Sequence, residues 1–331
     1  MFGHSGVGAA WPDRPLRIPA STNSRGNNLS DGGRPRVVVF GDVIDDIVVR
    51  PHREPLVDTD TQSSIRQVPG GAAANVSAWL GDAGVDVDFI GRVGAIDCDY
   101  HAAFLADFGV RAHLTPDATR PTGTIIVIVD ENEGRTVLIE RGANRVLTPN
   151  DVPDSLLDGA AALYFTGYTV FSGQHDPEGT VDSFQHLLGR CRERGVPVVV
   201  DPGSGGQLAD FGVAHFLRAV AGASVLLPNL PEGRALTGLE DPFDVATRLA
   251  ESFGLVALTM GAEGAVVAVD GQPPVMVPAA GGDRTDASGA GDAFGAGFVA
   301  AWLEGASMTS AADAGSRLAA RAIAIVGGRP V

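Results

Sequence analysis

The sequence contains no lysine, and all of its 24 basic residues are arginines. This absence excludes mechanisms that depend on a lysine side chain, namely the P-loop lysine, the strand lysine of protein kinases and a Schiff-base lysine. Cysteine is also scarce, since only Cys98 and Cys191 are present and they lie far apart. We therefore expect two ordinary thiols rather than a disulfide or a cysteine metal site.

Positive charge is in deficit, with a net charge of −16 at pH 7. Nucleic acids and anionic membranes both require a clustered positive surface, so neither is expected as a partner. No stretch approaches the roughly 20 uninterrupted apolar residues of a membrane span, and the first residues lack the basic-then-apolar order of a signal peptide. The expected location is the cytoplasm.

The chain has enough apolar residues for a large core, because 44% are hydrophobic and 19% are charged. Its 331 residues predict one large domain with a smaller element attached. Residues 1–33 are rich in Gly, Ser, Asn and Pro without an apolar period, which predicts a flexible tail without an assigned function. The folded part is expected to cover residues 34–331.

Short apolar runs alternate with helical patterns along this folded part. Runs that end at Gly or Pro are typical of buried strands, and apolar residues spaced every three or four positions indicate helices. Strands are predicted at residues 37–40, 87–90, 163–166, 196–200, 225–227 and 255–259, and helices at about 70–83, 178–194 and 242–253. This alternation predicts a three-layer α/β/α fold with a mostly parallel central sheet.

One segment departs from the alternation. Residues 124–129 and 136–140 are β-rich and flank the polar turn 130–134, which predicts a hairpin. Together with the extended residues 44–49, this hairpin is expected to form a small β-sheet lid that projects from the main body. Its strands are expected within about residues 44–66 and 118–141. The alternative is an antiparallel edge of the central sheet.

The strongest motif is the run DASGAGDAF at residues 286–294, which leads into an apolar helix ending near residue 303. Gly289, Ala290 and Gly291 leave consecutive backbone amides unobstructed at a helix start, where the helix dipole favours an anion. Asp292 on the same turn can accept the proton of a hydroxyl nucleophile while the amides stabilise charge on a transferred group. The alternative is a glycine-rich loop with a helix-capping aspartate.

This run resembles the D-T-x-G-A-G-D signature of the ribokinase-like (PfkB) carbohydrate kinase family. Upstream, PGGAAAN at residues 69–75 is similar to the family's G-G-x-x-x-N element, and GRVG at residues 91–94 is similar to its G-x-V-G. The similarity extends from about Arg36 to the C-terminus. It implies a ribokinase-like fold and ATP-dependent phosphoryl transfer to a hydroxyl group, with Asp292 as the general base and Gly289, Ala290 and Gly291 as the anion hole.

The resemblance also implies where ATP and Mg²⁺ bind. NLPE at residues 229–232 is similar to the family's N-x-x-E element, which implies that Glu232 and Asn229 bind Mg²⁺, largely through water. Without the resemblance, these two residues predict a helix cap and its partner. Residues 259–264 resemble the family's nucleotide loop, which implies that Thr259, Gly261 and Gly264 bind ATP together with Asn229.

The acceptor site is implied by two further segments. GDVIDD at residues 41–46 matches the family's first strand and turn, where a carboxylate binds substrate hydroxyls, and Asp46 aligns with it better than Asp45. RGAN at residues 141–144 is similar to a segment at the base of the lid. The implied acceptor-binding residues are Asp46, Gly70, Gly71, Asn75, Arg141 and Asn144. Arg141 is expected either to bind a carboxylate or phosphate of the substrate or to form a surface salt bridge.

Some positions depart from the family pattern. Ala287 replaces the usual Thr and removes a hydroxyl near a loop associated with a monovalent cation, which weighs against potassium activation. Asp286 remains a candidate ligand for such an ion. Ala72 stands where ribokinases commonly have Lys, and FTGY at residues 165–168 lacks the acidic residue expected for ribose recognition. Ribose is therefore not the favoured substrate.

The predicted substrate is a sugar. A nucleoside is the first alternative, because nucleoside kinases use the same scaffold with an apolar lid, and a sugar acid such as 2-keto-3-deoxygluconate is favoured if Arg141 faces the pocket. A sugar-binding sensor without catalysis is more distant, because it needs neither Asp292 nor Glu232. A homodimer joined through the lids is expected, since it would cover exposed strand edges.

Overall fold

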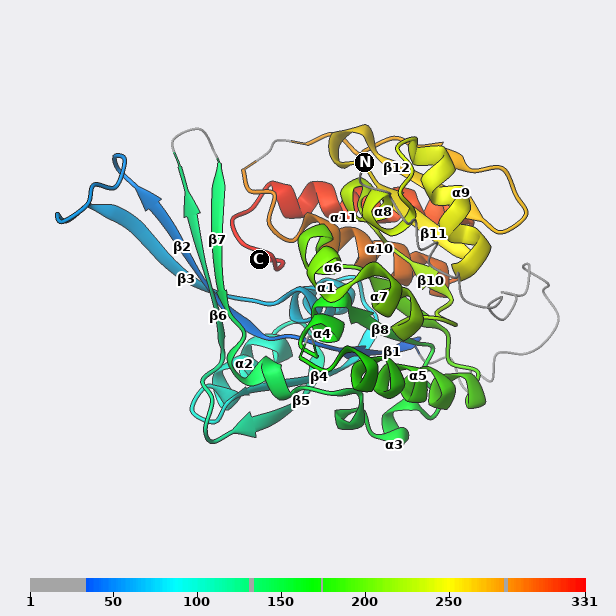
Figure 1. Ribbon diagram of the computed structural model, residues 1–331, viewed down its shortest axis with the longest axis horizontal. Coiled ribbons are helices and arrows are strands. Elements are labelled where there is room, and N and C mark those ends of the chain that lie inside the picture. Colours follow the sequence, from blue (N-terminus) through cyan, green and yellow to red (C-terminus); the bar gives the residue numbers. More distant parts are fainter. Residues whose placement is uncertain (1–33, 131–133, 174, 283–284) are drawn as a thin grey trace, which may run out of the picture.

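The computed structural model describes residues 34–130, 134–173, 175–282 and 285–331. The predicted tail at residues 1–33 and the middle of the predicted turn, residues 131–133, lie outside the described residues. Figure 1 shows a large α/β body and a small sheet that projects from it. The candidate active site lies where the body and the small sheet meet.

A nine-stranded sheet forms the centre of the described chain, in the order β13-β12-β11-β10-β9-β8-β1-β4-β5. All neighbours from β11 to β5 are parallel, whereas β12 and β13 extend the sheet antiparallel beyond β11. The strands are β1 (Arg36–Phe40), β4 (Asp86–Gly94), β5 (Val110–Asp117), β8 (Ala162–Thr166), β9 (Val198–Asp201), β10 (Val225–Leu226), β11 (Leu255–Thr259), β12 (Ala265–Val269) and β13 (Val275–Val277). The mostly parallel sheet is therefore confirmed.

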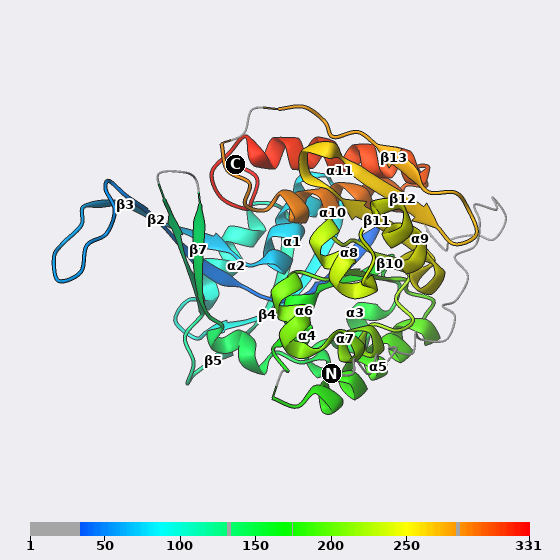
Figure 2. The same cartoon turned by 45° about the horizontal axis from the view of Figure 1, so that its top comes forward.

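Helices cover both faces of this sheet (Figures 1 and 2), because strand side chains alternate between two cores. In β1, Val37 and Val39 enter one core, and Val38 and Phe40 the other. The first core includes α1 (Ala72–Asp82), α2 (Cys98–Ala106), α10 (Ala290–Leu303) and α11 (Met308–Ile323). The second includes α3 (Asp154–Leu157), α4 (Gly167–Phe171), α5 (Pro177–Glu193), α6 (Gly205–Phe211), α7 (Val213–Ala219), α8 (Leu230–Thr237) and α9 (Pro242–Phe253). The three-layer prediction is confirmed, and no helix in the described ranges is both long and apolar enough to span a membrane.

The lid is a separate four-stranded sheet with the order β3-β2-β6-β7. Its strands are β2 (Ile44–Pro51), β3 (Ser63–Gly70), β6 (Gly123–Val129) and β7 (Arg135–Glu140). The predicted hairpin pairs as β6 with β7, and β2 joins it in parallel. The prediction of a separate sheet is therefore right, and the alternative of a central-sheet edge is wrong. β3 runs on to Gly70, beyond the range predicted for the lid strands.

The chain order places a crevice at the carboxyl ends of the parallel strands. From β1 the chain moves outward to β4 and β5, and it then returns to β8, β9, β10 and β11 on the other side. Open α/β sheets bind ligands where the strand order reverses, which here lies between β1 and β8. Asp42 follows β1, Asp201 ends β9 and Asn229 follows β10. These polar groups therefore meet at one edge of the sheet, beside the lid.

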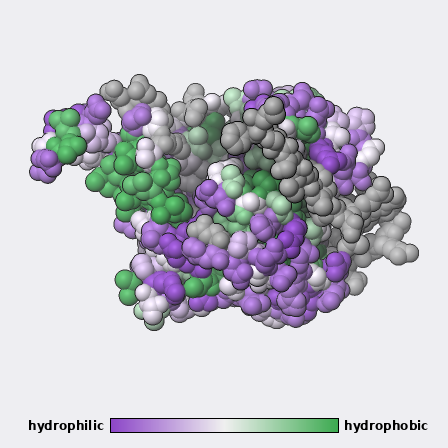
Figure 3. All heavy atoms as spheres, in the orientation of Figure 1, coloured by the Kyte–Doolittle hydropathy of each residue, from purple (hydrophilic) through white to green (hydrophobic). Residues whose placement is uncertain are grey.

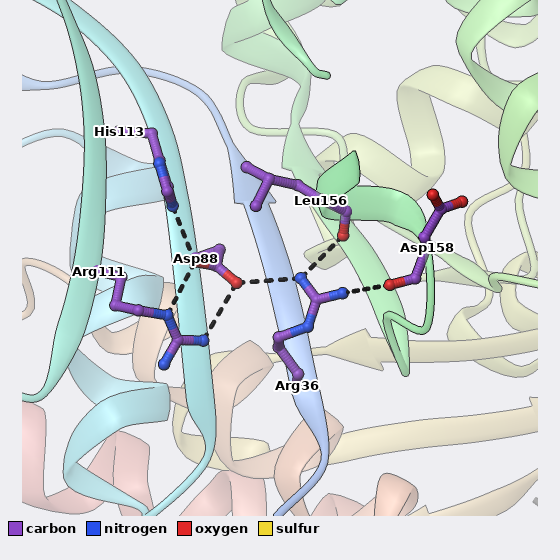
Figure 4. Close-up of polar contacts among 6 residues, drawn as sticks. All are labelled: Arg36, Asp88, Arg111, His113, Leu156 and Asp158. Atoms are coloured by element: carbon purple, nitrogen blue, oxygen red, sulfur yellow. Dashed lines mark hydrogen bonds and ion pairs between the residues drawn. The ribbon is translucent and has the colours of Figure 1, made fainter. Parts of the chain in front are cut away.

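A charge cluster around the buried Asp88 joins strands at the opposite, amino-terminal edge (Figure 4). Asp88 of β4 accepts hydrogen bonds from Arg36 of β1 (3.0 Å) and Arg111 of β5 (2.9 and 3.1 Å), and it contacts His113 at 2.8 Å. Arg36 also donates to two main-chain carbonyls near α3. Burial acts to raise the pKa of Asp88, but these hydrogen bonds outweigh it and hold that pKa well below its usual range. The cluster therefore fastens three strands far from the crevice.

Candidate active site

A cavity of about 620 Å³ lies between the lid and the carboxyl ends of the central strands. The residues predicted from the sequence that line it are Asp46, Gly71, Asn75, Arg141, Asn144, Asn229, Glu232, Thr259, Gly289, Ala290, Gly291 and Asp292. Four other predicted positions, Gly70, Gly261, Gly264 and Asp286, do not belong to the lining. The fold therefore gathers most of the predicted acceptor, nucleotide and anion-binding positions into one cavity.

The start of α10 has the geometry of an anion site. Gly289 has a left-handed φ of 72°, and a Cβ atom there would lie 2.5 Å from the Cα of Gly328, so this position requires glycine. A Cβ on Gly291 would meet nothing within 4 Å, so this side of the helix start is open. No described side chain caps the helix, which leaves its first amides available to a ligand.

Asp286 shapes this loop from behind. Its Oδ1 accepts a hydrogen bond from the amide of Ser288 at 2.9 Å, and its Oδ2 accepts one from the amide of Gly327 at 3.2 Å. The side chain is buried. Asp286 therefore ties the loop to the C-terminal segment. Asp286 does not line the cavity, so this structure gives no support to its predicted role as a ligand for a monovalent ion.

Asp292 lies on the first turn of α10, where it is partly exposed and lines the cavity. Nδ2 of Asn75 donates a hydrogen bond to its Oδ2 at 2.9 Å. Burial raises the pKa of Asp292 well above its usual range, the Asn75 hydrogen bond acts to lower it, and the nearby Asp201 and Asp42 raise it further. A carboxylate with a raised pKa is a stronger base, which suits proton acceptance from a hydroxyl group.

Adjacent aspartates of β2 point to different places. Asp46 lines the cavity, where burial raises its pKa to about 7 and Arg329 acts to lower it. Asp45 does not line it, and its Oδ1 lies 3.5 Å from Nε2 of His101, which is fully buried. Successive strand residues face opposite sides of a sheet, which accounts for the difference. The geometry favours Asp46 as the residue that faces an acceptor.

Asn229 and Glu232 form a capping box at the start of α8. The side chain of Asn229 accepts from the amide of Glu232 at 2.9 Å, and the side chain of Glu232 accepts from the amide of Asn229 at 2.9 Å. The helix cap, which was the alternative interpretation of these two residues, is therefore formed, and both residues also line the cavity. Burial raises the pKa of Glu232 to about 8, with Asp201 as a further cause. Across the described residues, no group of three or more His, Cys, Asp or Glu side chains could by itself hold a metal.

Arg141 lines the cavity at the base of the lid. It donates from Nη1 to the carbonyl of Tyr168 at 3.0 Å and from Nη2 to Oε1 of Gln207. The surface salt bridge considered for Arg141 is not formed with any described residue. Asn144 has its side chain bonded to the backbone of Val43, at 2.8 Å and 3.1 Å, so much of its hydrogen-bonding capacity is used to fix the lid base.

The predicted glycines of the nucleotide loop differ in what they do. Gly264 has a φ of 106°, and a Cβ there would lie 2.1 Å from the carbonyl of Val277, so it is required by the turn itself. Gly261 has a φ of 59° with open space around it. Thr259, at the end of β11, lines the cavity. Of this loop, only Thr259 reaches the space between the lid and the sheet.

The lid presents an apolar face to the cavity. The lining residues from the lid strands are Ile44, Asp46, Ile125, Val127, Val137 and Ile139. Strand pairing places Ile125 beside Ile139 and Val127 beside Val137, so these four side chains share one face. Figure 3 shows a hydrophobic area over the lid strands. An acceptor under this lid therefore meets one carboxylate in an otherwise apolar wall.

The geometry agrees with a comparison to known proteins. The family described as pfkB family carbohydrate kinase matches residues 34–330. The chain belongs to this family. This pfkB kinase is 31% identical over 277 residues to the ATP-dependent ribose-1-phosphate kinase of Halopiger xanaduensis, with 81% of this chain and 85% of that protein covered.

Solved structures show that the pfkB kinase shares its fold with sugar and nucleoside kinases. The adenosine kinase of Sinorhizobium meliloti has a TM-score of 0.79 at 23% identity, covering 90% of this chain and 97% of that one. The Arabidopsis thaliana ribokinase complexed with ribose and ATP has a TM-score of 0.70 at 21% identity, covering 89% and 94%. The predictions of family, fold and kinase class are confirmed.

Three charged groups of this pfkB kinase were not predicted from the sequence: Asp42, Asp201 and Arg329. Asp42 lines the cavity and accepts hydrogen bonds from the first amides of α1, at 3.2 Å and 3.3 Å. Asp201 also lines it, and burial raises its pKa to about 6. Their position at the carboxyl ends of buried parallel strands was a usable signal. No local pattern indicates Arg329, which comes third from the C-terminal end.

Proposed function

We propose that this kinase transfers the γ-phosphoryl group of ATP to a hydroxyl group of a sugar, with Asp292 as the general base. One observation carries the proposal: Asp292 and the open amides at the start of α10 line the same cavity as Asp46 and Asn75. A base, an anion-binding helix start and polar groups suited to hydroxyls are thus arranged around one space.

The proposed reaction is an in-line displacement at the γ-phosphorus. Asp292 takes the acceptor proton at Oδ1, because its Oδ2 accepts the hydrogen bond from Asn75. The acceptor oxygen bonds to the γ-phosphorus, the bond from this phosphorus to the bridging oxygen breaks, and ADP leaves with that electron pair. The amides of residues 289–291 stabilise negative charge on the phosphoryl oxygens, and Asp46 orients the acceptor.

The residues of the cavity suit ATP with Mg²⁺. Asn229, Glu232 and Asp201 all line it and carry oxygen atoms, which Mg²⁺ prefers as ligands. Bound Mg²⁺ would neutralise charge on the phosphates, while water completes its coordination. Burial raises the pKa of Asp201 to about 6 and that of Glu232 to about 8, so a nearby cation would favour the charged form of both carboxylates.

A nucleoside acceptor is the second candidate, and the apolar lid favours it. Ile125, Val127, Val137 and Ile139 form a hydrophobic wall over the cavity. A purine or pyrimidine base can stack or pack against such a wall, whereas a free sugar has little apolar surface to bury there.

An anionic acceptor is favoured by Arg141. Its guanidinium lines the cavity and is held by Tyr168 and Gln207 without a carboxylate partner among the described residues. Guanidinium groups bind carboxylates and phosphates through paired hydrogen bonds. The Halopiger relative is described as a ribose-1-phosphate kinase, so a sugar phosphate joins the sugar acids in this class.

The test is ADP release by the purified protein with ATP, Mg²⁺ and a panel of neutral sugars, nucleosides, sugar acids and sugar phosphates. The proposal predicts the highest kcat/KM for a neutral sugar. A higher kcat/KM for nucleosides would identify the acceptor as a nucleoside. A higher kcat/KM for anionic acceptors that is lost in Arg141→Gln would identify it as a sugar acid or sugar phosphate. Ligand binding without ADP release across the panel would contradict a kinase function and support a sensor. Replacement of K⁺ by Na⁺ should leave the rate unchanged.

A further inference from the structure

Arg329 is buried behind the acceptor side of the cavity, with 4% of its surface exposed. Its Nε donates to Oδ1 of Asn75 at 3.1 Å, and its Nη2 donates to the carbonyl of Gly70 at 2.6 Å. The guanidinium also lies 5.2 Å from the ring centre of Phe104. Nη1 is buried without a hydrogen-bond partner among the described atoms. Burying a charged group so incompletely paired is unfavourable, so fold stability alone does not account for Arg329.

The contact with Asn75 determines how that amide is oriented. A guanidinium has only donors, so the Asn75 atom that faces Arg329 must be the oxygen. The NH₂ group of Asn75 must then face the other way, where it donates to Oδ2 of Asp292 at 2.9 Å. With the amide reversed, an oxygen would face a carboxylate and an NH₂ group would face a guanidinium. Arg329 therefore excludes the reversed amide and supports the ionised form of Asp292.

The C-terminal segment that carries Arg329 is fixed to both sides of the site. The carbonyl of Gly328 accepts a hydrogen bond from Nε1 of Trp79 in α1 at 2.8 Å. The amide of Gly327 donates a hydrogen bond to Asp286, which precedes the anion-binding start of α10. The Cα of Gly328 lies so close to Gly289 that only glycine fits there. Arg329 is thus held at a defined distance from α1 and from the start of α10.

We propose that Arg329 is a positioning residue for phosphoryl transfer: by fixing the amide of Asn75, it holds the base Asp292 in place and ionised. The inference rests on the proposed role of Asp292. The charge of Arg329 also acts on Asp46, whose carboxylate oxygen Oδ1 is buried without a hydrogen-bond partner in the described structure. The groups whose charges interact with Arg329 include Asp46, Tyr100, Asp292 and Asp42, and also Asp45 and His101. Its positive charge therefore serves the acceptor carboxylate as well as the base.

The test compares Arg329→Met with a matched control, Arg36→Met. Arg36 also donates to two main-chain carbonyls and to a polar side chain, but it lies at the far edge of the sheet. Loss of positioning should lower the kcat of Arg329→Met on the order of 10²-fold, with the KM for ATP nearly unchanged. Arg36→Met should lower the melting temperature and leave kcat unchanged. Equal kcat in Arg329→Met and the wild type would overturn the proposal.

A double variant separates positioning from stability. If Arg329 acts through Asn75, Arg329→Met should reduce kcat little further in an Asn75→Ala background, because the amide it orients is gone. Losses that multiply would contradict the proposal. Should Arg329→Met fail to fold, Arg329→Lys retains the charge but cannot donate from two fixed positions, so its kcat should still fall. Normal kcat in Arg329→Lys would overturn the role of Arg329, while normal kcat in Asp292→Asn would overturn the proposed base itself.

Discussion

The carboxylate of Asp46 lies directly against Gly70: a Cβ atom on Gly70 would be 2.2 Å from Oδ2 and 2.7 Å from Oδ1. Gly70 ends the lid strand β3, where its Cα pairs with that of Ile44 in β2. Gly70 is the first glycine of the G-G-x-x-x-N element. Glycine is required there for a steric reason, because any side chain would displace the Asp46 carboxylate. The position of Asp46 and the identity of residue 70 are physically coupled.

Gly70→Ala should weaken acceptor binding without affecting ATP. Displacement of Asp46 removes a hydrogen bond to a charged group, which is worth roughly 1.5–3 kcal/mol and corresponds to a rise of about 10-fold to 150-fold in the acceptor KM. Steady-state kinetics with each substrate varied in turn measures both constants. Gly281→Ala is the control, because a Cβ there meets nothing within 4 Å. An unchanged acceptor KM in Gly70→Ala would remove Asp46 from acceptor binding.

The pH dependence of kcat/KM should report the acceptor carboxylate. The pKa of Asp46 is raised to about 7 by burial, so below that value the group is largely protonated and is only a weaker, neutral acceptor for a hydroxyl hydrogen bond. We expect kcat/KM for the acceptor to rise between about pH 6 and about pH 8. Asp46→Asn should lower kcat/KM. The pH dependence that remains, from Asp292, should move to lower pH, because the variant removes a negative charge that raises the pKa of Asp292. A flat profile in the wild type would contradict this assignment.

Low pH should reduce the stability of the fold, because it protonates Asp88. Its pKa is depressed in the folded protein, so its contribution to stability is complete above the unfolded pKa near 4 and is lost as the pH falls through the folded pKa. At pH 7, Asp88→Asn should reduce the free energy of unfolding by roughly 1.5–3 kcal/mol, since it weakens charged hydrogen bonds. The difference from the wild type should shrink below about pH 4. Chemical denaturation at several pH values measures it.

The control for this stability measurement is Asp313→Asn. Asp313 pairs with Arg317 on the exposed side of α11, and such surface pairs contribute about 0–1 kcal/mol. Its effect should therefore be small at every pH. An equal loss of stability in both variants would show that the cluster around Asp88 has no special role.

We propose that the protein forms a homodimer through its lids. Strand pairing places Ile47, Val49, Ile65, Ile126 and Leu138 on the lid face opposite the cavity. Ile65 is 64% exposed and Leu138 is 53% exposed, so this apolar face is open to a partner. Light scattering should give the mass of two chains for the wild type and of one chain for Leu138→Arg. Val275→Arg, on the edge strand β13, is the control and should stay dimeric.

Much of the fold could be predicted because each strand and helix has a local cause. The apolar run at residues 37–40 becomes β1, and the helix at about 242–253 matches α9 because Asp241 caps its start and Pro242 suits its first turn. The predicted lid range ends at residue 66, so residues 67–70 of β3 were not predicted as part of a strand. Their extended form depends on pairing with β2, which no local pattern encodes.

The candidate site could be predicted in part for the same reason. Asp292 and residues 289–291 form a local motif, so they were found, and the cavity contains them. Arg329 contacts Asn75 across 254 residues, so its position depends on the folded C-terminal segment. The two aspartates Asp45 and Asp46 differ only in the face of β2 to which they point, and the strand register settles that.

The most direct test is the turnover of Asp292→Asn beside ATP binding measured by calorimetry. We predict a fall in kcat of about 10²–10⁴-fold, the contribution of a general base, with the dissociation constant for ATP nearly unchanged, because the amides at the start of α10 remain. Asp45→Asn, which changes a carboxylate outside the cavity, should keep most of its turnover. Turnover of Asp292→Asn close to that of the wild type would contradict the proposed mechanism.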